Sequence, residues 1–195
     1  MRKFLPWIII GGIVLILFIW FKGINNTAVT LNANIEESWG NVQTSYQRRN
    51  DLIGNLVNTV KGAAEHERET LTAVVEARAK ATSVQVDPTN ITPEQLAAFN
   101  QAQSGVSSAL SRLLVSVEAY PTLQANQNFL KLQDELASTE NQILTARTRF
   151  NEAVKPYNVH VTRFPNNIIA GMFGFEKKAF FDAVEGADRP VEVQF

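Results

Sequence analysis

Residues 35–62 read IEESWGNVQTSYQRRNDLIGNLVNTVKG, and the large apolar positions in this stretch decide the fold. They recur at alternating spacings of four and three residues, the pattern of a helix that buries one narrow seam against partner helices. The seam comprises Ile35, Trp39, Val42, Tyr46, Arg49, Ile53, Leu56, Val60, Ala63 and Glu67. The spacing predicts a long helix from about Val29 to Ala81, a range without proline that would reach roughly 80 Å. A break near Gly54, a weak helix former, is the open alternative.

Two further helices follow the same pattern. After a loop at 83–95, Thr92 can cap a helix that has Pro93 at its first position and Gln95 placed to complete a capping box. That helix ends or kinks at Pro121. The third runs from about 126 to 162, and Pro156 predicts a kink or a restart within it. The inward positions predicted for the second helix are Leu96, Phe99, Gln103, Val106, Leu110, Leu113, Val117 and Tyr120. Those of the third are Phe129, Leu132, Leu136, Ile143, Phe150, Val154 and Tyr157.

A separate apolar segment precedes these helices. The run from Phe4 to Phe21 carries no charge and would span roughly 27 Å as a helix, enough for a bilayer core. Trp7 and Trp20 stand near its two ends, where interfacial aromatic residues belong. A cleaved signal peptide is the alternative, but the run ends in FIWFK without a small-residue cleavage site, which favours an uncleaved anchor.

Flanking charges indicate the orientation of this anchor. Arg2 and Lys3 precede it, whereas Lys22 alone follows closely, so the N-terminus is expected in the cytoplasm and the helical domain outside it. We therefore expect a single-pass protein of the bacterial inner membrane with a periplasmic domain. Its predicted parts are a cytoplasmic N-terminus (1–3), the transmembrane anchor (4–22), a helical bundle (23–164), and a short helix with an extended tail (165–195).

Composition argues against several functional classes. Eighteen basic and nineteen acidic residues give a net charge of -1, which offers no basic face for nucleic acid. The chain has no cysteine, and its two histidines, His66 and His160, each lack a second ligand at metal-binding spacing. Glu65 and Glu67 lie on different sides of a helix, so they do not converge on a substrate. We expect no catalytic residue, no cofactor and no metal site, and hence no enzyme.

Short connections make neighbouring helices antiparallel, so the expected fold is all-α, a coiled-coil-like bundle of three or four helices on a membrane anchor. In this scheme the first helix leaves the membrane, the second returns and the third leaves again. The second helix would cover only about 40 Å of the first. Trp39, Val42 and Tyr46 would then lack cover within their own subunit, which suggests a homo-oligomer.

Polar residues interrupt the seam at three positions. Arg49 and Glu67 occupy core positions of the first helix, and Gln103 occupies one of the second. Their side chains either reach out from the seam edge or form an arginine–carboxylate pair that fixes the register between helices. A register role is favoured over catalysis.

The C-terminal part begins with YNVHVTRFPNNIIAGMFGF at residues 157–175. Tyr157 and Phe164 continue the spacing of the third helix and are predicted to be its last core layers. A short helix after Pro165 would fold over the end of the bundle far from the membrane. The four phenylalanines that would close the core there are Phe173, Phe175, Phe180 and Phe181. Alternatively they form an exposed aromatic surface, with Lys177 and Lys178 beside it, that binds a neighbouring subunit or a second lipid surface.

Long ordered motifs resemble the LemA family of bacterial membrane proteins. They are RRNDLIGNLVNTVKGAAEHERETL (48–71), EAYPTLQANQNFLKLQDELASTENQI (118–143), ARTRFNEAVKPYNVHVTRFPNNIIAGMFGF (146–175) and the tail FF…RPVEVQF. The chain departs from the family at Gly54, where proline is common. The resemblance implies a helical bundle on one transmembrane helix without an established activity or cofactor. It also implies an association of some relatives with membrane zinc proteases.

These observations favour a non-enzymatic, self-associating scaffold that is anchored in the lipid bilayer and organises envelope components or membrane shape. The alternative is an adaptor or sensor subunit for a membrane-bound zinc metalloprotease or a signalling partner.

Overall fold

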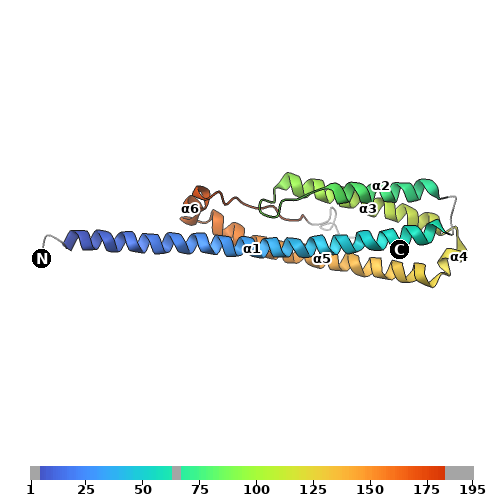
Figure 1. Ribbon diagram of the computed structural model, residues 1–195, viewed down its shortest axis with the longest axis horizontal. Coiled ribbons are helices and arrows are strands. Elements are labelled where there is room, and N and C mark those ends of the chain that lie inside the picture. Colours follow the sequence, from blue (N-terminus) through green and yellow to red (C-terminus); the bar gives the residue numbers. More distant parts are fainter. Residues whose placement is uncertain (1–4, 63–66, 183–195) are drawn as a thin grey trace, which may run out of the picture.

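The computed structural model describes residues 5–62 and 67–182, and within these ranges it contains helices and loops without a strand. Ala63, His66 and the tail beyond Asp182 lie outside the described residues. The helices are α1 (Leu5–Lys61), α2 (Arg68–Ser83), α3 (Pro93–Val117), α4 (Pro121–Gln124), α5 (Gln127–Thr162) and α6 (Asn166–Met172) (Figure 1). The predicted all-α fold class is confirmed.

Two antiparallel helix pairs make up the bundle. α5 runs along the C-terminal two thirds of α1, and α2 packs on α3 to form a second, shorter pair beside them (Figure 1). We call the end of the bundle next to the N-terminal part of α1 its proximal end and the end at α4 its distal end. α6 lies at the proximal end, against α1 and α5.

The break in the first predicted helix falls later than Gly54. α1 passes Gly54 without interruption and ends at Lys61, and α2 begins at Arg68. Gly54 makes room for Arg78 of α2, because a Cβ at this glycine would stand 3.2 Å from the guanidinium Nη1. The prediction of one helix from Val29 to Ala81 is therefore wrong: the chain reverses between Lys61 and Arg68.

Because of this reversal, the later helices run in the directions opposite to those predicted. α2 returns toward the proximal end, α3 runs outward, and α5 returns (Figure 1). The prediction that the C-terminal segment lies at the far end of the bundle is wrong for the same reason. α6 lies at the proximal end instead, against α1 and α5.

The part of α1 that carries Trp39, Val42 and Tyr46 is covered within its own chain. α5 has 36 residues and spans about 54 Å, which matches the roughly 57 Å from Ile24 to Lys61 in α1. Trp39, Val42 and Tyr46 are buried, with 1%, 0% and 5% of their surface exposed. They need no second subunit, so their expected lack of cover is corrected.

Local signals fix the starts of the later helices. Thr92 Oγ1 accepts a hydrogen bond from Gln95 N, and the Gln95 side chain accepts one from Thr92 N, which confirms the predicted capping box. Asn126 caps α5 by accepting from the backbone N–H groups of Asn128 and Phe129. α5 continues through Pro156 without a restart.

The core of the bundle is divided into two apolar clusters along its length. The proximal cluster is rich in aromatic residues and includes Trp39, Phe99 and Phe150. The distal cluster is mostly aliphatic and is built around Ile53 and Leu113.

Candidate functional site

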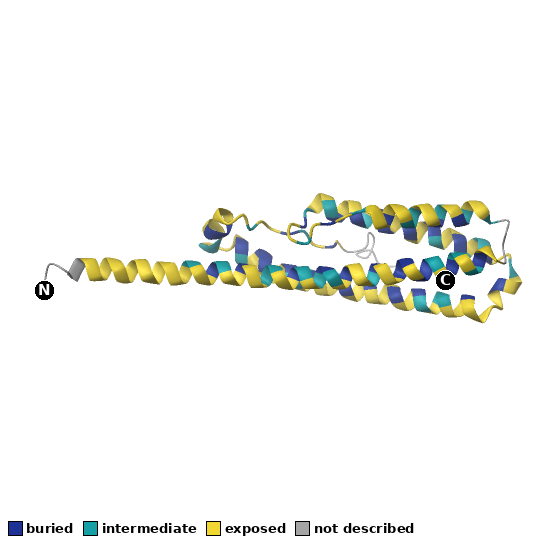
Figure 2. Ribbon diagram, viewed as in Figure 1, coloured by how far each residue is buried: buried dark blue, intermediate teal, exposed yellow. Residues whose placement is uncertain are grey.

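The N-terminal part of α1 exposes apolar side chains on all sides. Every residue from Trp7 to Trp20 is exposed, and burial begins with Phe21, which is partly covered, and Ile24, which is 7% exposed (Figure 2). By length and composition this helix can cross a membrane. Its exposed segment fits a lipid environment, because a helix that is apolar all round requires an apolar surrounding.

The end of α5 and α6 pack against α1 just after this exposed segment. The rings of Phe21 and Phe173 are 5.3 Å apart, and His160 Nε2 lies 3.0 Å from the carbonyl oxygen of Ile24. Tyr157 is buried in the proximal cluster, as predicted for a late core layer of α5. Phe164 is 75% exposed, so its prediction as a core layer is wrong. The reason is that α5 ends at Thr162 and Arg163 has an extended backbone, so the helical spacing no longer applies at the phenylalanine.

Residues 173–182, which we call the C-terminal strap, run between the two helix pairs and are held by two asparagines of α5. Asn158 Nδ2 donates to the carbonyl oxygen of Lys178, and Asn158 Oδ1 accepts from Lys178 N, both at 2.8 Å. Asn151 pairs in the same way with the backbone of Phe181, at 2.9 and 2.8 Å. Each asparagine thus satisfies both backbone polar groups of one strap residue.

The distance between the two asparagines matches the distance between the two strap residues that they hold. Asn151 and Asn158 are seven residues apart, which is about 10.5 Å along a helix. Lys178 and Phe181 are three residues apart, which is about 10 Å of extended chain. Neither asparagine was predicted to hold this segment. Each asparagine directly follows an inward position, Phe150 or Tyr157, but exposed residues of α5 such as Leu144 do the same, so the sequence does not single them out.

Phe181 fills the centre of the proximal cluster. Its ring stacks on Trp39 at 6.0 Å and meets the edges of Phe150 at 5.3 Å and Phe99 at 6.5 Å. The guanidinium of Arg147 covers it at 4.6 Å. The strap therefore completes the core with Phe181, in the proximal half of the bundle and not at its far end.

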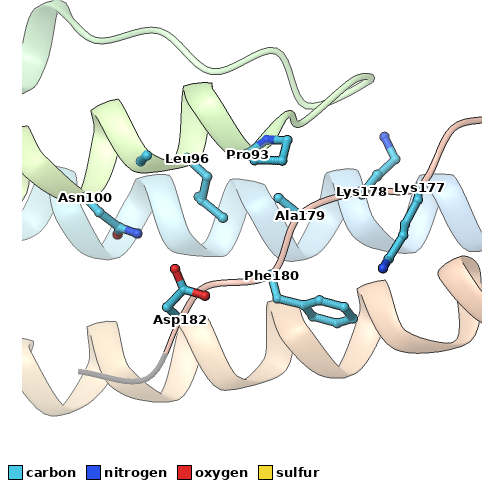
Figure 3. A pocket seen from close by; sticks show the side chains of 9 residues that line it. Pro93, Leu96, Asn100, Lys177, Lys178, Ala179, Phe180 and Asp182 are labelled. Carbon is cyan, nitrogen blue, oxygen red and sulfur yellow. The ribbon is translucent and has the colours of Figure 1, made fainter. Parts of the chain in front are cut away.

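The other three phenylalanines of the segment are divided between core and surface. Phe175 is half-buried against the proximal cluster. Phe173 is 49% exposed and Phe180 is 38% exposed. Phe180 and Lys177 line a shallow cavity of about 330 Å³ between the strap and Pro93 of α3 (Figure 3).

Lys178 does not belong to an exposed aromatic and basic surface, contrary to the alternative prediction. It is 3% exposed, and its Nζ donates to the carbonyl oxygens of Pro88 and Thr89 in the α2–α3 loop. Its ammonium also lies 5.5 Å from the ring centre of Tyr157. Burial lowers the pKa of Lys178, and the nearby carboxylates of Glu36 and Asp87 oppose this shift. Lys178 therefore ties the strap to the second helix pair.

A buried arginine lies between the two apolar clusters. Arg49 donates through Nη1 to Ser107 Oγ at 3.3 Å and to Glu140 Oε1 at 3.2 Å, and through Nη2 to Gln103 Oε1. Its guanidinium also lies 4.9 Å from the ring centre of Tyr46. These contacts join α1, α3 and α5 in one polar layer.

The electrostatics of this layer act on Tyr46. Burial raises the pKa of Tyr46, and the positive charges of Arg147 and Arg49 counteract part of that rise. Within the described part of the chain, Arg49 Nε has no hydrogen-bond acceptor. The arginine–carboxylate pair expected from the seam thus involves Glu140 of α5.

Glu67 lies apart from this layer. It precedes α2 at the distal end, and its Oε1 accepts a hydrogen bond of 3.1 Å from the hydroxyl of Tyr120. The seam position assigned to Glu67 does not hold, because α1 ends at Lys61. The pair ties the start of α2 to the segment after α3.

Metal-binding groups do not gather in this arrangement. Residues 5–62 and 67–182 contain no cluster of three or more histidine, aspartate or glutamate side chains that could hold a metal ion. The polar groups that do come together, around Arg49, Asn151 and Asn158, make contacts within the chain. Their arrangement can hold helices and an extended segment in place.

Comparison with known proteins gives relatives over most of the chain. Magnetosome proteins MamQ 1 and MamQ 2 of Paramagnetospirillum magneticum are each 28% identical to it over 183 aligned residues, which cover 85% of this chain and 67% of the relative. Protein LemA of Metamycoplasma hominis is 24% identical over 170 residues, covering 87% of this chain and 74% of the relative. The model of the LemA family matches residues 38–195, so the chain belongs to the LemA family.

Proposed function

We propose that this protein is a non-enzymatic, membrane-anchored scaffold whose rigid helical bundle organises envelope components or membrane shape. One observation carries the proposal. The exposed apolar part of α1 and its core-forming part belong to one helix, without a break from Leu5 to Lys61. A force that acts on the bundle, including one from a bound partner, is therefore transmitted along α1 to the membrane segment without an intervening hinge.

Self-association belongs to the proposal and is supported by the outer side of α5. Leu130 and Leu144 are 46% and 58% exposed, and they are two heptads apart on one side of this helix. If they packed against the same side of α5 in a second copy, the two bundles would stand side by side, with the contact running along the membrane normal. The buried Trp39 region contributes nothing to this contact.

Electron microscopy and mass photometry of the full-length protein in nanodiscs test the scaffold. We expect particles that contain several copies, and we expect Leu130→Ser with Leu144→Ser to reduce them to single copies. The matched control is Thr145→Ser, which changes an exposed neighbour on the same helix. Monomeric wild-type particles at all concentrations would contradict self-association.

Co-purification from native membranes separates the scaffold from the alternative adaptor role. Homomeric particles alone support the scaffold, whereas a stoichiometric membrane protease in the same particle supports the adaptor. The names of the MamQ relatives connect those proteins with the magnetosome. For this chain they support a role in building or organising a cellular structure.

The proposed periplasmic orientation has a direct test, because the chain contains no cysteine. Val115→Cys places a thiol at a position that is 64% exposed in the bundle. A maleimide that cannot cross the inner membrane should label this variant in cells whose outer membrane is permeabilised. Labelling only after lysis would place the bundle in the cytoplasm.

A further inference from the structure

The segment that contains α6 exposes an apolar face that no part of the described bundle covers. Phe164 is 75% exposed, Ile168 58%, Met172 72% and Phe173 49%. Ile168 and Met172 are four residues apart in α6, so they lie on one side of that helix, and Phe164 precedes the helix in the turn after α5. No charged residue occurs from Phe164 to Phe175. An uncovered apolar face of this kind marks an interaction surface.

The position of this face is fixed relative to the anchor. Phe173 contacts Phe21 with ring centres 5.3 Å apart, and His160 Nε2 lies 3.0 Å from the carbonyl oxygen of Ile24. The residues of α1 from Trp7 to Trp20 are exposed, and burial begins at Phe21 and Ile24 (Figure 2). The apolar face of α6 therefore continues the exposed surface of α1 at the level where that surface ends.

This level corresponds to the boundary of the bilayer. The uncharged run from Phe4 to Phe21 spans about 27 Å as a helix, close to the hydrocarbon thickness of about 30 Å. Phe21 consequently lies where aromatic side chains gather at membrane surfaces. Phe173 lies at the same depth, since it packs on Phe21. Basic residues border the region, with Lys22 next to Phe21 and Arg163 next to Phe164.

We propose that Phe164 and α6 form an interfacial lipid-binding element that inserts into the outer part of the bilayer holding α1. The inference rests on the membrane anchoring that is part of the proposed function. α1 alone would leave the bundle free to rotate about the anchor axis and to tilt. A second attachment at α6 fixes which side of the bundle faces the membrane.

Single cysteines in the full-length chain test this element, and the natural absence of cysteine makes each label unique. Met172→Cys reports on α6, Ile13→Cys on the anchor and Val115→Cys on the distal end, and all three positions are exposed. Each variant carries a nitroxide spin label in nanodiscs of phosphatidylcholine and phosphatidylglycerol. Electron paramagnetic resonance then compares the accessibility to oxygen with that to a water-soluble nickel chelate.

The label at 172 should be severalfold less accessible to nickel than the label at 115, at a depth of about 5–10 Å into the boundary of headgroups and acyl chains. Equal nickel accessibility at 172 and 115 overturns the proposal. If the label at 13 is also fully accessible to nickel, membrane anchoring itself has failed. Protection at 172 with spin–spin broadening that disappears on dilution with unlabelled protein would assign the face to a second copy and also overturn the proposal.

A charge variant provides the second readout. Gly171→Cys offers a label site with no atom within 4 Å of its Cβ. Ile168→Asp with Met172→Asp should abolish the protection of this label, whereas Ile168→Leu with Met172→Leu should keep it. Both double variants should melt like the parent by far-ultraviolet circular dichroism, since the altered side chains are exposed. Protection that persists in the aspartate variant overturns the proposal.

Discussion

Removing the side chain of Asn158 should release the C-terminal strap and destabilise the whole bundle. Asn158→Ala deletes two hydrogen bonds of 2.8 Å to the backbone of Lys178, in a site where the asparagine is 5% exposed. A buried backbone group left without a partner costs about 1–3 kcal/mol, so the N–H and the carbonyl together should cost about 2–6 kcal/mol. The loss extends to Phe181, because the strap positions that ring in the core.

Asn151→Ala should cost less than Asn158→Ala. Its two hydrogen bonds to Phe181 are only partly buried, so water can replace them, and a net loss of about 1–2 kcal/mol is expected. The double variant should cost less than the sum of the two, because both asparagines hold the same segment and residues that share one network are coupled. Asn141→Ala, an exposed position on the same helix, is the matched control and should stay within about 0.5 kcal/mol of the parent.

The fluorescence of Trp39 provides the assay. Trp7→Phe and Trp20→Phe leave Trp39 as the sole tryptophan of the three in the chain, and Phe181 stacks on it at 6.0 Å. Denaturant unfolding of the full-length protein in detergent micelles then gives the free energy of unfolding for each variant. An Asn158→Ala variant as stable as Asn141→Ala, with an unchanged Trp39 spectrum, would refute the role of the two asparagines.

Three further predictions use the same denaturation assay. Arg49→Ala should cost about 2–4 kcal/mol, because it leaves the buried Gln103 without its partner and opens a cavity. Glu140→Gln should cost less than about 1 kcal/mol, since that carboxylate is 49% exposed. Equal losses in the two variants would refute this prediction. Gly54→Ala should stabilise the protein by up to about 1 kcal/mol, because alanine favours the helix more than glycine does. The Arg78 guanidinium, which would stand 3.2 Å from the new Cβ, can move away. A decrease of more than about 1 kcal/mol in the free energy of unfolding would show that Arg78 cannot move. Burial raises the pKa of Tyr157 in the folded protein above its ordinary 10.0. The neutral phenol therefore contributes to the free energy of unfolding below pH 10, and this contribution is lost as the pH rises through the raised pKa of the folded state. The difference in stability between the parent and Tyr157→Phe, measured from pH 8 upward, should therefore fall above about pH 10, and a constant difference would contradict the prediction.

Heptad spacing predicted which residues form helices and face the core, but it did not predict the direction in which the helices run. The spacing of Ile35, Trp39 and Val42 and the cap at Thr92 depend on local geometry, and both were correct. The reversal after Lys61 was missed because the same spacing continues through Ala63 and Glu67, so periodicity alone gives no sign that the helix has ended. One missed turn placed the C-terminal segment at the wrong end.

The contacts of the site could be predicted only in part. Arg49 was recognised because a charge on an apolar seam requires a partner, but that partner, Glu140, lies 91 residues away in the chain. Asn151 and Asn158 carry no local signal that distinguishes them from solvent-exposed asparagines. Their role depends on an extended segment whose path is set by tertiary packing.

The length of the bundle also defines a distance from the membrane. From Ile24, where α1 becomes covered, to Lys61 near α4 the helix measures about 57 Å, and a typical tilt of about 20° would reduce its height above the bilayer to about 54 Å. The unbroken α1 keeps this height constant. If α1 crosses the membrane as proposed, a molecule that binds at the distal tip would stand roughly 50–60 Å from the membrane surface, and the length of one helix would set that distance.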